Sequence, residues 1–122
     1  MDLKLNSILI GSEDPGRLVD FYTKVFGDPQ WSDGGYTGWQ LGAAAVMIGP
    51  HDQVKGKNAV PGRLIWNLET ADVRGEFDRI AGTGATVVQE PYAPGGDVSE
   101  DMLLCTFADP DDNYFQLATP MP

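Results

Sequence analysis

Few residues of this sequence could carry out acid–base, nucleophilic or metal chemistry. Among the 122 residues, His51 is the only histidine and Cys105 the only cysteine. A lone cysteine cannot form an intrachain disulfide or a cysteine metal cluster, and we expect Cys105 to be a small buried side chain rather than a nucleophile. His51 lies in a segment typical of a connection, and no neighbour is identifiable that could orient it as a general base. We therefore expect His51 to be solvated, and the sequence assigns no catalytic residue.

Three carboxylates gather in one short stretch, at Asp109, Asp111 and Asp112. A calcium-binding loop of the EF-hand type would need a regular ligand spacing and a closing glutamate, and both are missing. The neighbouring Pro110 and Asn113 are residue types that favour a tight turn. We expect this stretch to be a turn without a metal ion.

The chain as a whole is acidic, with a formal net charge of −10. Such a surface repels phosphate backbones and anionic membranes, so we expect no nucleic-acid partner and no membrane contact. No apolar stretch approaches the roughly 20 residues of a membrane span, and the first residues lack the pattern of a secretory signal. The length and composition predict one soluble, cytoplasmic domain.

The first half of the chain predicts a strand, a helix and further short strands. Residues 3–10 alternate as a strand does, and Asp14 followed by Pro15 is a typical helix start. Apolar residues then recur every three or four positions until Gly27, which indicates an amphipathic helix that ends there. Short strands are predicted at residues 36–41 and 44–48.

The second half repeats this order after a connection rich in Pro, Gly and Asn. A strand is predicted at residues 63–68, a helix from Asp72 to residues 82–84, and strands at residues 85–89, 102–107 and 114–118. The helix starts and the helix-ending glycines keep their spacing between the halves to within one residue. We infer an internal duplication and an α+β fold: one domain, residues 1–122, with module one at 1–50, a linker at 51–62 and module two at 63–122.

Three segments, at residues 7–27, 65–84 and 107–117, resemble the vicinal-oxygen-chelate superfamily, which includes glyoxalases and bleomycin-resistance proteins. The first contains DPGRLVDFY followed by VFG, the second is its counterpart in module two, and the third reads FADPDDNYFQL. The resemblance implies two βαβββ modules that form a curved mixed sheet around a cavity. Because relatives are commonly dimeric, it also implies a homodimer.

Metal-dependent members of this superfamily carry a histidine on the first strand of each module and a glutamate or similar ligand on the last. Counted from the helix starts, the two histidine positions hold Ser7 and Ile65. The glutamate position of the last strand holds Gln116, and the matching place in module one is nearest Met47. These side chains offer no fixed charge to a divalent ion, so we expect neither a metal nor another cofactor.

The strand alternation, combined with the resemblance, predicts which side chains line the cavity. Trp66 is expected beneath the helix of module two. Four rings beside Gly-rich segments, those of Trp31, Tyr36, Trp39 and Tyr92, could stack on a ligand, and we place Tyr36 and Trp39 in the site. The predicted ligand-binding residues are Ser7, Leu9, Tyr36, Trp39, Met47, Ile65, Asn67 and Gln116.

The function that these residues favour is metal-free capture of a small apolar or aromatic molecule, such as an antibiotic-like compound. A cationic ligand would be attracted by the net charge and by Glu90, Asp97, Glu100 and Asp101. Two alternatives stay open at this point. One is an enzyme of the same superfamily, a lyase, isomerase or dioxygenase with non-standard residues. The other is an interaction or regulatory module, because a fold does not fix a function.

Overall fold

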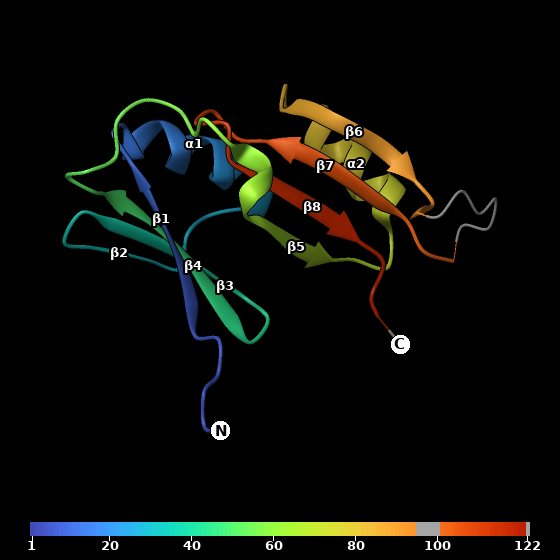
Figure 1. The fold of residues 1–122 in the computed structure, drawn as a ribbon, viewed down its shortest axis with the longest axis horizontal. Helices are drawn as coiled ribbons and strands as arrows, with labels where there is room; N and C mark the ends of the chain where they lie inside the picture. Colours follow the sequence, from blue (N-terminus) through green and yellow to red (C-terminus); the bar gives the residue numbers. More distant parts are fainter. Residues whose placement is uncertain (95–100, 122) are drawn as a thin grey trace. The chain divides into compact units, whose positions relative to one another are not determined.

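The computed structural model describes residues 1–94 and 101–121 and divides into two compact units, Met1–Gly56 and Lys57–Pro122. Each unit has the order strand, helix, three strands (Figure 1). The predicted α+β architecture of two βαβββ modules is therefore confirmed. Asp97 and Glu100, which were expected to attract cations, lie outside the described residues.

The first unit is a four-stranded mixed sheet with one helix. The strand order in the sheet is β1-β4-β3-β2, in which β1 runs parallel to β4 and the other pairs are antiparallel. Its elements are β1 (Ser7–Ser12), α1 (Pro15–Phe26), β2 (Trp31–Asp33), β3 (Tyr36–Leu41) and β4 (Ala44–Pro50).

The second unit repeats this topology. Its sheet has the order β5-β8-β7-β6, with β5 parallel to β8, and a short 3-10 helix precedes β5. The elements are η1 (Pro61–Arg63), β5 (Ile65–Glu69), α2 (Val73–Ala81), β6 (Thr86–Tyr92), β7 (Leu104–Ala108) and β8 (Tyr114–Ala118).

Both helices start as the sequence predicts. An Asp14 carboxylate oxygen accepts the Arg17 N–H of α1 at 3.4 Å, and an Asp72 oxygen accepts the Gly75 N–H of α2 at 3.0 Å. Each carboxylate thereby satisfies one of the free N–H groups of a first helical turn. Gly27 follows α1 with φ +88°, a conformation that favours glycine. The caps lie at equivalent places in the two units.

The core of each unit lies between its helix and one face of its sheet. In unit one, α1 buries Leu18 and Tyr22, and the sheet buries Trp39, Val46 and Ile48. In unit two, four aromatic rings follow one another: Trp66 contacts Phe115, which stacks on Phe107, which stacks on Phe77 of α2. Trp66 therefore lies on the helix side of the sheet, as predicted.

The predicted strand at residues 3–10 begins only at Ser7. Ser7 pairs with Ala45, and in the same parallel register Ala44, the first residue of β4, lies opposite Asn6, so residues 3–5 have no β4 residue opposite them. Leu3 and Leu5 are accordingly 77% and 69% exposed. The sequence did not predict strand β2. This strand has only three residues, all exposed, and so shows no apolar alternation.

The acidic stretch between β7 and β8 is a turn, as predicted. Asp109 is buried, and one of its carboxylate oxygens accepts the N–H groups of Asp111 and Asn113 at 2.8 and 3.0 Å. Asp112 adopts φ +62°, which Asp tolerates better than most residues. Within the described residues, no helix has the length and apolarity needed to cross a membrane.

Candidate functional site

Each sheet has one face covered by its helix and one face opposite the helix, which we call its open face. In unit one the register places Leu9 opposite Met47, Met47 opposite Gly38, and Gly38 opposite Trp31. Because side chains alternate between faces, these residues share a face that is opposite to buried Val46 and Trp39. They form one row across all four strands of the open face.

Aromatic rings lie directly on glycines of this face. A methyl group at Gly38 would overlap the Trp31 indole, and one at Gly49 would overlap the ring of Tyr36. Glycine is needed at both positions because only hydrogen leaves room for a ring so close to the backbone. Trp31 and Tyr36 remain 36% and 37% exposed. Each ring is therefore supported by the sheet and still offers surface to a ligand.

His51 lies at the end of the same face. A methyl group at Gly11, which pairs with Gly49, would come within 2.9 Å of the His51 Cβ atom. The Gln53 N–H donates to His51 Nδ1 at 3.2 Å, and an Asp52 carboxylate oxygen lies 3.6 Å from the same nitrogen. The side chain is 48% exposed, in agreement with the predicted solvated residue. No local pattern in the sequence indicates that the connection folds back over Gly11.

The open face of unit two is polar. The register aligns Asn67, Gln116, Thr106 and Gln89 across its four strands. The Gln116 amide nitrogen donates to the Thr106 hydroxyl at 3.1 Å, which fixes the amide in one orientation. The Gln116 carbonyl oxygen and the exposed Asn67 amide can then bond to a ligand. This row can orient a polar group but brings no charge.

The positions where the superfamily holds a metal do not fit one here. Ser7 pairs with Ala45, and Ile65 pairs with Tyr114. Two residues further along the strands, Met47 pairs with Leu9 and Gln116 pairs with Asn67. A hydroxyl, an alkyl group, a thioether and an amide provide no negative charge to offset the desolvation of a divalent ion. Across residues 1–94 and 101–121, no three His, Cys, Asp or Glu side chains are grouped so as to hold a metal.

The buried thiol of Cys105 lies on the helix side of the second sheet, opposite Leu117. Desolvation by burial raises its pKa above the ordinary value of 9.0, while a hydrogen bond with the Leu117 backbone opposes this. A thiol held in its neutral form is a poor nucleophile. The expectation of a small buried residue is confirmed.

Seven of the eight predicted ligand-binding residues lie on open faces. Trp39 does not: it is 1% exposed, its indole N–H donates to the Gly27 carbonyl at 2.8 Å, and its ring meets Phe26 of α1. Placing Trp39 in the site was wrong. Gly38 is on the open face, and its neighbour Trp39 therefore points to the opposite, helix-covered face. The residues on open faces are Ser7, Leu9, Tyr36 and Met47 in unit one, and Ile65, Asn67 and Gln116 in unit two.

Two further residues of these faces were missed by the sequence prediction. Trp31 was one of four rings considered for stacking, and the signal that could have singled it out was Gly38, a glycine inside a predicted strand. Thr106 shows no such signal, because only the pairing of β7 with β8 brings it to Gln116.

Comparison with known proteins gives one family and many similar structures. A family model described as a glyoxalase-like domain matches residues 7–118. A search of curated proteins finds no match. A glyoxalase-related enzyme from Fulvimarina pelagi has a TM-score of 0.75 at 18% identity, over 96% of this chain and 88% of its own.

Two more structures cover nearly all of both chains. A glyoxalase/bleomycin resistance protein/dioxygenase family enzyme from Burkholderia phytofirmans PsJN has a TM-score of 0.74 at 17% identity, over 98% of this chain and 100% of its own. TnmS3, an antibiotic binding protein from Streptomyces sp. CB03234, has a TM-score of 0.69 at 20% identity, over 99% of each chain. Identities this low show the fold alone. Because the family model spans both modules, the resemblance to the vicinal-oxygen-chelate superfamily is confirmed, and this chain belongs to the glyoxalase-like domain family.

Proposed function

We propose that this chain is a metal-free binding protein for small molecules that contain flat rings. The observation that supports this most is the placement of Trp31 and Tyr36 on Gly38 and Gly49 in the open face of unit one. Rings held against a backbone lose little freedom when a ligand stacks on them, which lowers the entropic cost of binding. Leu9, which is 51% exposed, extends the same apolar surface.

The open face of unit two, taken by itself, offers fixed polar groups to a ligand. A binding site for a small molecule is largely apolar, with a few fixed polar groups that set the orientation of the ligand. The Gln116 amide, fixed by its hydrogen bond to Thr106, is such a group, and Asn67 is its neighbour across the sheet. A carbonyl or hydroxyl group of a ligand would match this row.

Binding would be stoichiometric capture without chemical change. TnmS3, an antibiotic binding protein, has the same fold at 20% identity, which is the reason for placing antibiotic-like compounds first among the ligands. The proposal retains a cytoplasmic location and a homodimer. It uses no group of either open face as an acid, base or nucleophile.

Apolar stacking should contribute more to affinity than charge. Burial of apolar surface is worth about 25 cal/mol per Å², so covering one ring face yields a few kcal/mol. A surface ion pair contributes about 1 kcal/mol or less and is screened by salt. Affinity for a neutral ring compound should therefore survive high ionic strength.

The test is a fluorescence titration with naphthalene and acridine as ring probes and decalin as the saturated control, at low and high salt. Trp31→Leu should weaken binding of both ring probes by about tenfold, the loss of one stacking contact. Trp66→Phe, on the helix side of the other unit, should leave affinity unchanged. Equal affinity for decalin, or normal binding by Trp31→Leu, would contradict the proposal.

A further inference from the structure

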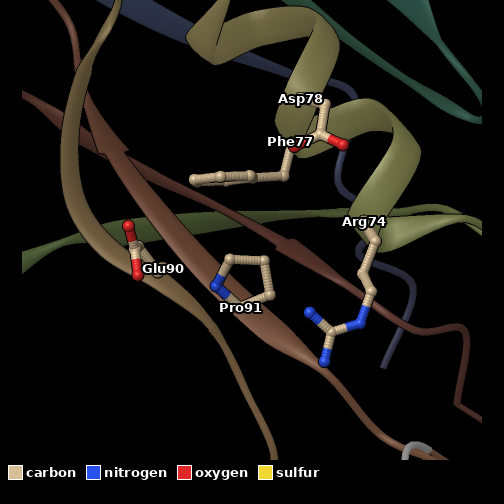
Figure 2. Close-up of a pocket in the computed structure, with 5 residues that line it drawn as sticks. All are labelled: Arg74, Phe77, Asp78, Glu90 and Pro91. Atoms are coloured by element: carbon tan, nitrogen blue, oxygen red, sulfur yellow. The ribbon is translucent and has the colours of Figure 1, made fainter.

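A concave site lies in unit two, on the helix side of its sheet. It is a groove of about 270 Å³ between α2 and β6 (Figure 2). Helix α2 contributes Arg74, Phe77 and Asp78 to its lining, and β6 contributes Glu90 and Pro91. Because α2 covers the face opposite to the open face, this groove is separate from the surface proposed above to bind rings.

The floor of the groove is the ring of Phe77, the last of the four aromatic rings that start at Trp66. One side of Phe77 stacks on Phe107, with ring centroids 5.3 Å apart and an interplanar angle of 27°. Phe77 is only half-buried, and Figure 2 shows its ring extending from α2 toward β6, near the ring of Pro91. A flat ligand placed in the groove would continue the stack that starts at Trp66.

The rim of the groove has an excess of negative charge. Among the lining residues that the structure describes, Asp78 and Glu90 contribute two carboxylates, against the one guanidinium of Arg74. In the view of Figure 2, Glu90 and Arg74 lie on opposite sides of Pro91, and the α2 wall that carries Arg74 also carries Asp78 one helical turn away. A positive group is therefore favoured at the Glu90 end, and the net charge of −10 of the chain adds to this preference.

An added β-strand fits this edge poorly. Strand β6 is at the edge of its sheet, but its register with β7 shifts between Val87 and Gln89 and again between Gln89 and Tyr92. Pro91 has no N–H to donate to a neighbouring strand. Bulges and proline are the usual devices that stop strand addition, so we exclude an extended peptide paired to β6 as the occupant.

We propose that the groove between α2 and β6 binds a small aryl cation, a single aromatic ring carrying an amidinium or ammonium group. The ring would stack on Phe77 and contact Pro91, and the cation would lie at the Glu90 carboxylate, with the Asp78 carboxylate of α2 adding to the attraction. The volume of about 270 Å³ lies just below the range of about 300–1,000 Å³ of drug-sized sites, which suits one ring and a small substituent. This site does not depend on the ring-binding function of the open faces.

The experiment is an amide NMR titration of the full chain with benzamidinium, compared with neutral benzamide and anionic benzoate of the same shape. Chemical-shift changes should be centred on Arg74 to Asp78 and on Glu90. Glu90→Gln and Asp78→Asn change exposed side chains, and each should weaken benzamidinium binding about threefold, with about a tenfold loss for the double variant. Glu69→Gln at the end of β5 is the matched control and should bind normally.

Several results would overturn the proposal. Benzoate or benzamide binding as tightly as benzamidinium would rule out recognition of the cation. An equal loss of affinity in Glu69→Gln would show that benzamidinium responds to the net charge of the chain and not to the carboxylates of the groove. Shift changes at Leu9 and Met47 in place of Phe77 would move the ligand to the open face of unit one, which would support that function and exclude this site.

Discussion

Trp31 and Trp39 show how one position in a strand decides the role of an aromatic side chain. Both are near glycines in the sequence, and composition alone does not separate them. Trp39 pairs with Val46 and lies in the core, whereas Trp31 pairs with Gly38 and lies on the open face. The register, which the three residues of β2 do not reveal in the sequence, decides between these two positions.

Replacing Gly38 by alanine should remove ligand binding with little loss of stability. The added methyl group would displace the Trp31 indole, which is 36% exposed and can move outward. We expect about a tenfold loss in affinity for ring probes and a change in unfolding free energy of at most about 1 kcal/mol.

Equilibrium denaturation and fluorescence titration measure the two effects separately. Gly16→Ala in α1 is the control, because its new methyl group would meet only an Asp14 oxygen at 3.8 Å. Unchanged affinity in Gly38→Ala would show that Trp31 does not form the ligand platform.

Cys105 should be unreactive in the folded protein. Burial raises the pKa of its thiol above 9.0, so the thiolate is scarce at pH 8, and the sulfur is inaccessible to reagent. Reaction with a disulfide reagent should be about a hundredfold slower than in denaturant. Above pH 9 the unfolded thiol ionises before the folded one, so stability should fall as the pH rises further. Equal rates with and without denaturant, measured by absorbance, would contradict this.

The sequence predicts well whether a segment is a helix or a strand, and it predicts less well the residues at which that element begins and ends. Both helices and their caps followed from Asp14 and Asp72, since a capping carboxylate and an apolar stripe are local signals. The start of β1 did not, because the strand pattern of residues 3–10 begins before the first residue of β4 in the parallel register. Pairing partners, which a local pattern does not contain, set the end of a strand.

The two helix caps should contribute similar stability. Asp72→Ala and Asp14→Ala should each lower the free energy of unfolding by about 1 kcal/mol. Asp72 should cost slightly more, because its hydrogen bond is 3.0 Å long against 3.4 Å for Asp14. Chemical denaturation decides this, with Asp20→Ala within α1 as the control that should not destabilise. A cap variant as stable as that control would show that its carboxylate does not hold the helix start.

At the scale of the whole molecule, the duplication organises the chain, and its two copies have diverged in chemistry. Leu9 and Met47 occupy in unit one the positions that Asn67 and Gln116 occupy in unit two. The fold could be predicted because helix starts and strand patterns recur along the chain. The contrast between a ring-bearing face and an amide face could not, because it depends on pairings such as Thr106 with Gln116.

The homodimer remains a prediction, and the segment before β1 is where we expect it to be tested. Leu3 and Leu5 are exposed and keep the alternation of a strand without a partner on β4. Apolar residues arranged in this way favour pairing with another chain. Leu3→Asp with Leu5→Asp should convert a dimer into a monomer by light scattering, while Met121→Asp, also exposed, should not. A dimer that persists in the double variant would place the interface elsewhere.

We propose that the protein binds its ring-containing ligand without a metal ion and without chemical change in the ligand. The most direct measurement uses chelator-treated protein, analysed for metal content and then incubated with the tightest ring probe of the titration. Mass spectrometry of the bound and free fractions follows. We predict that the probe is retained at one molecule per chain with no divalent metal present, and that it is recovered unaltered when metals are added back. Conversion of the probe, or retention only after a divalent ion is restored, would contradict the account and indicate a lyase, isomerase or dioxygenase.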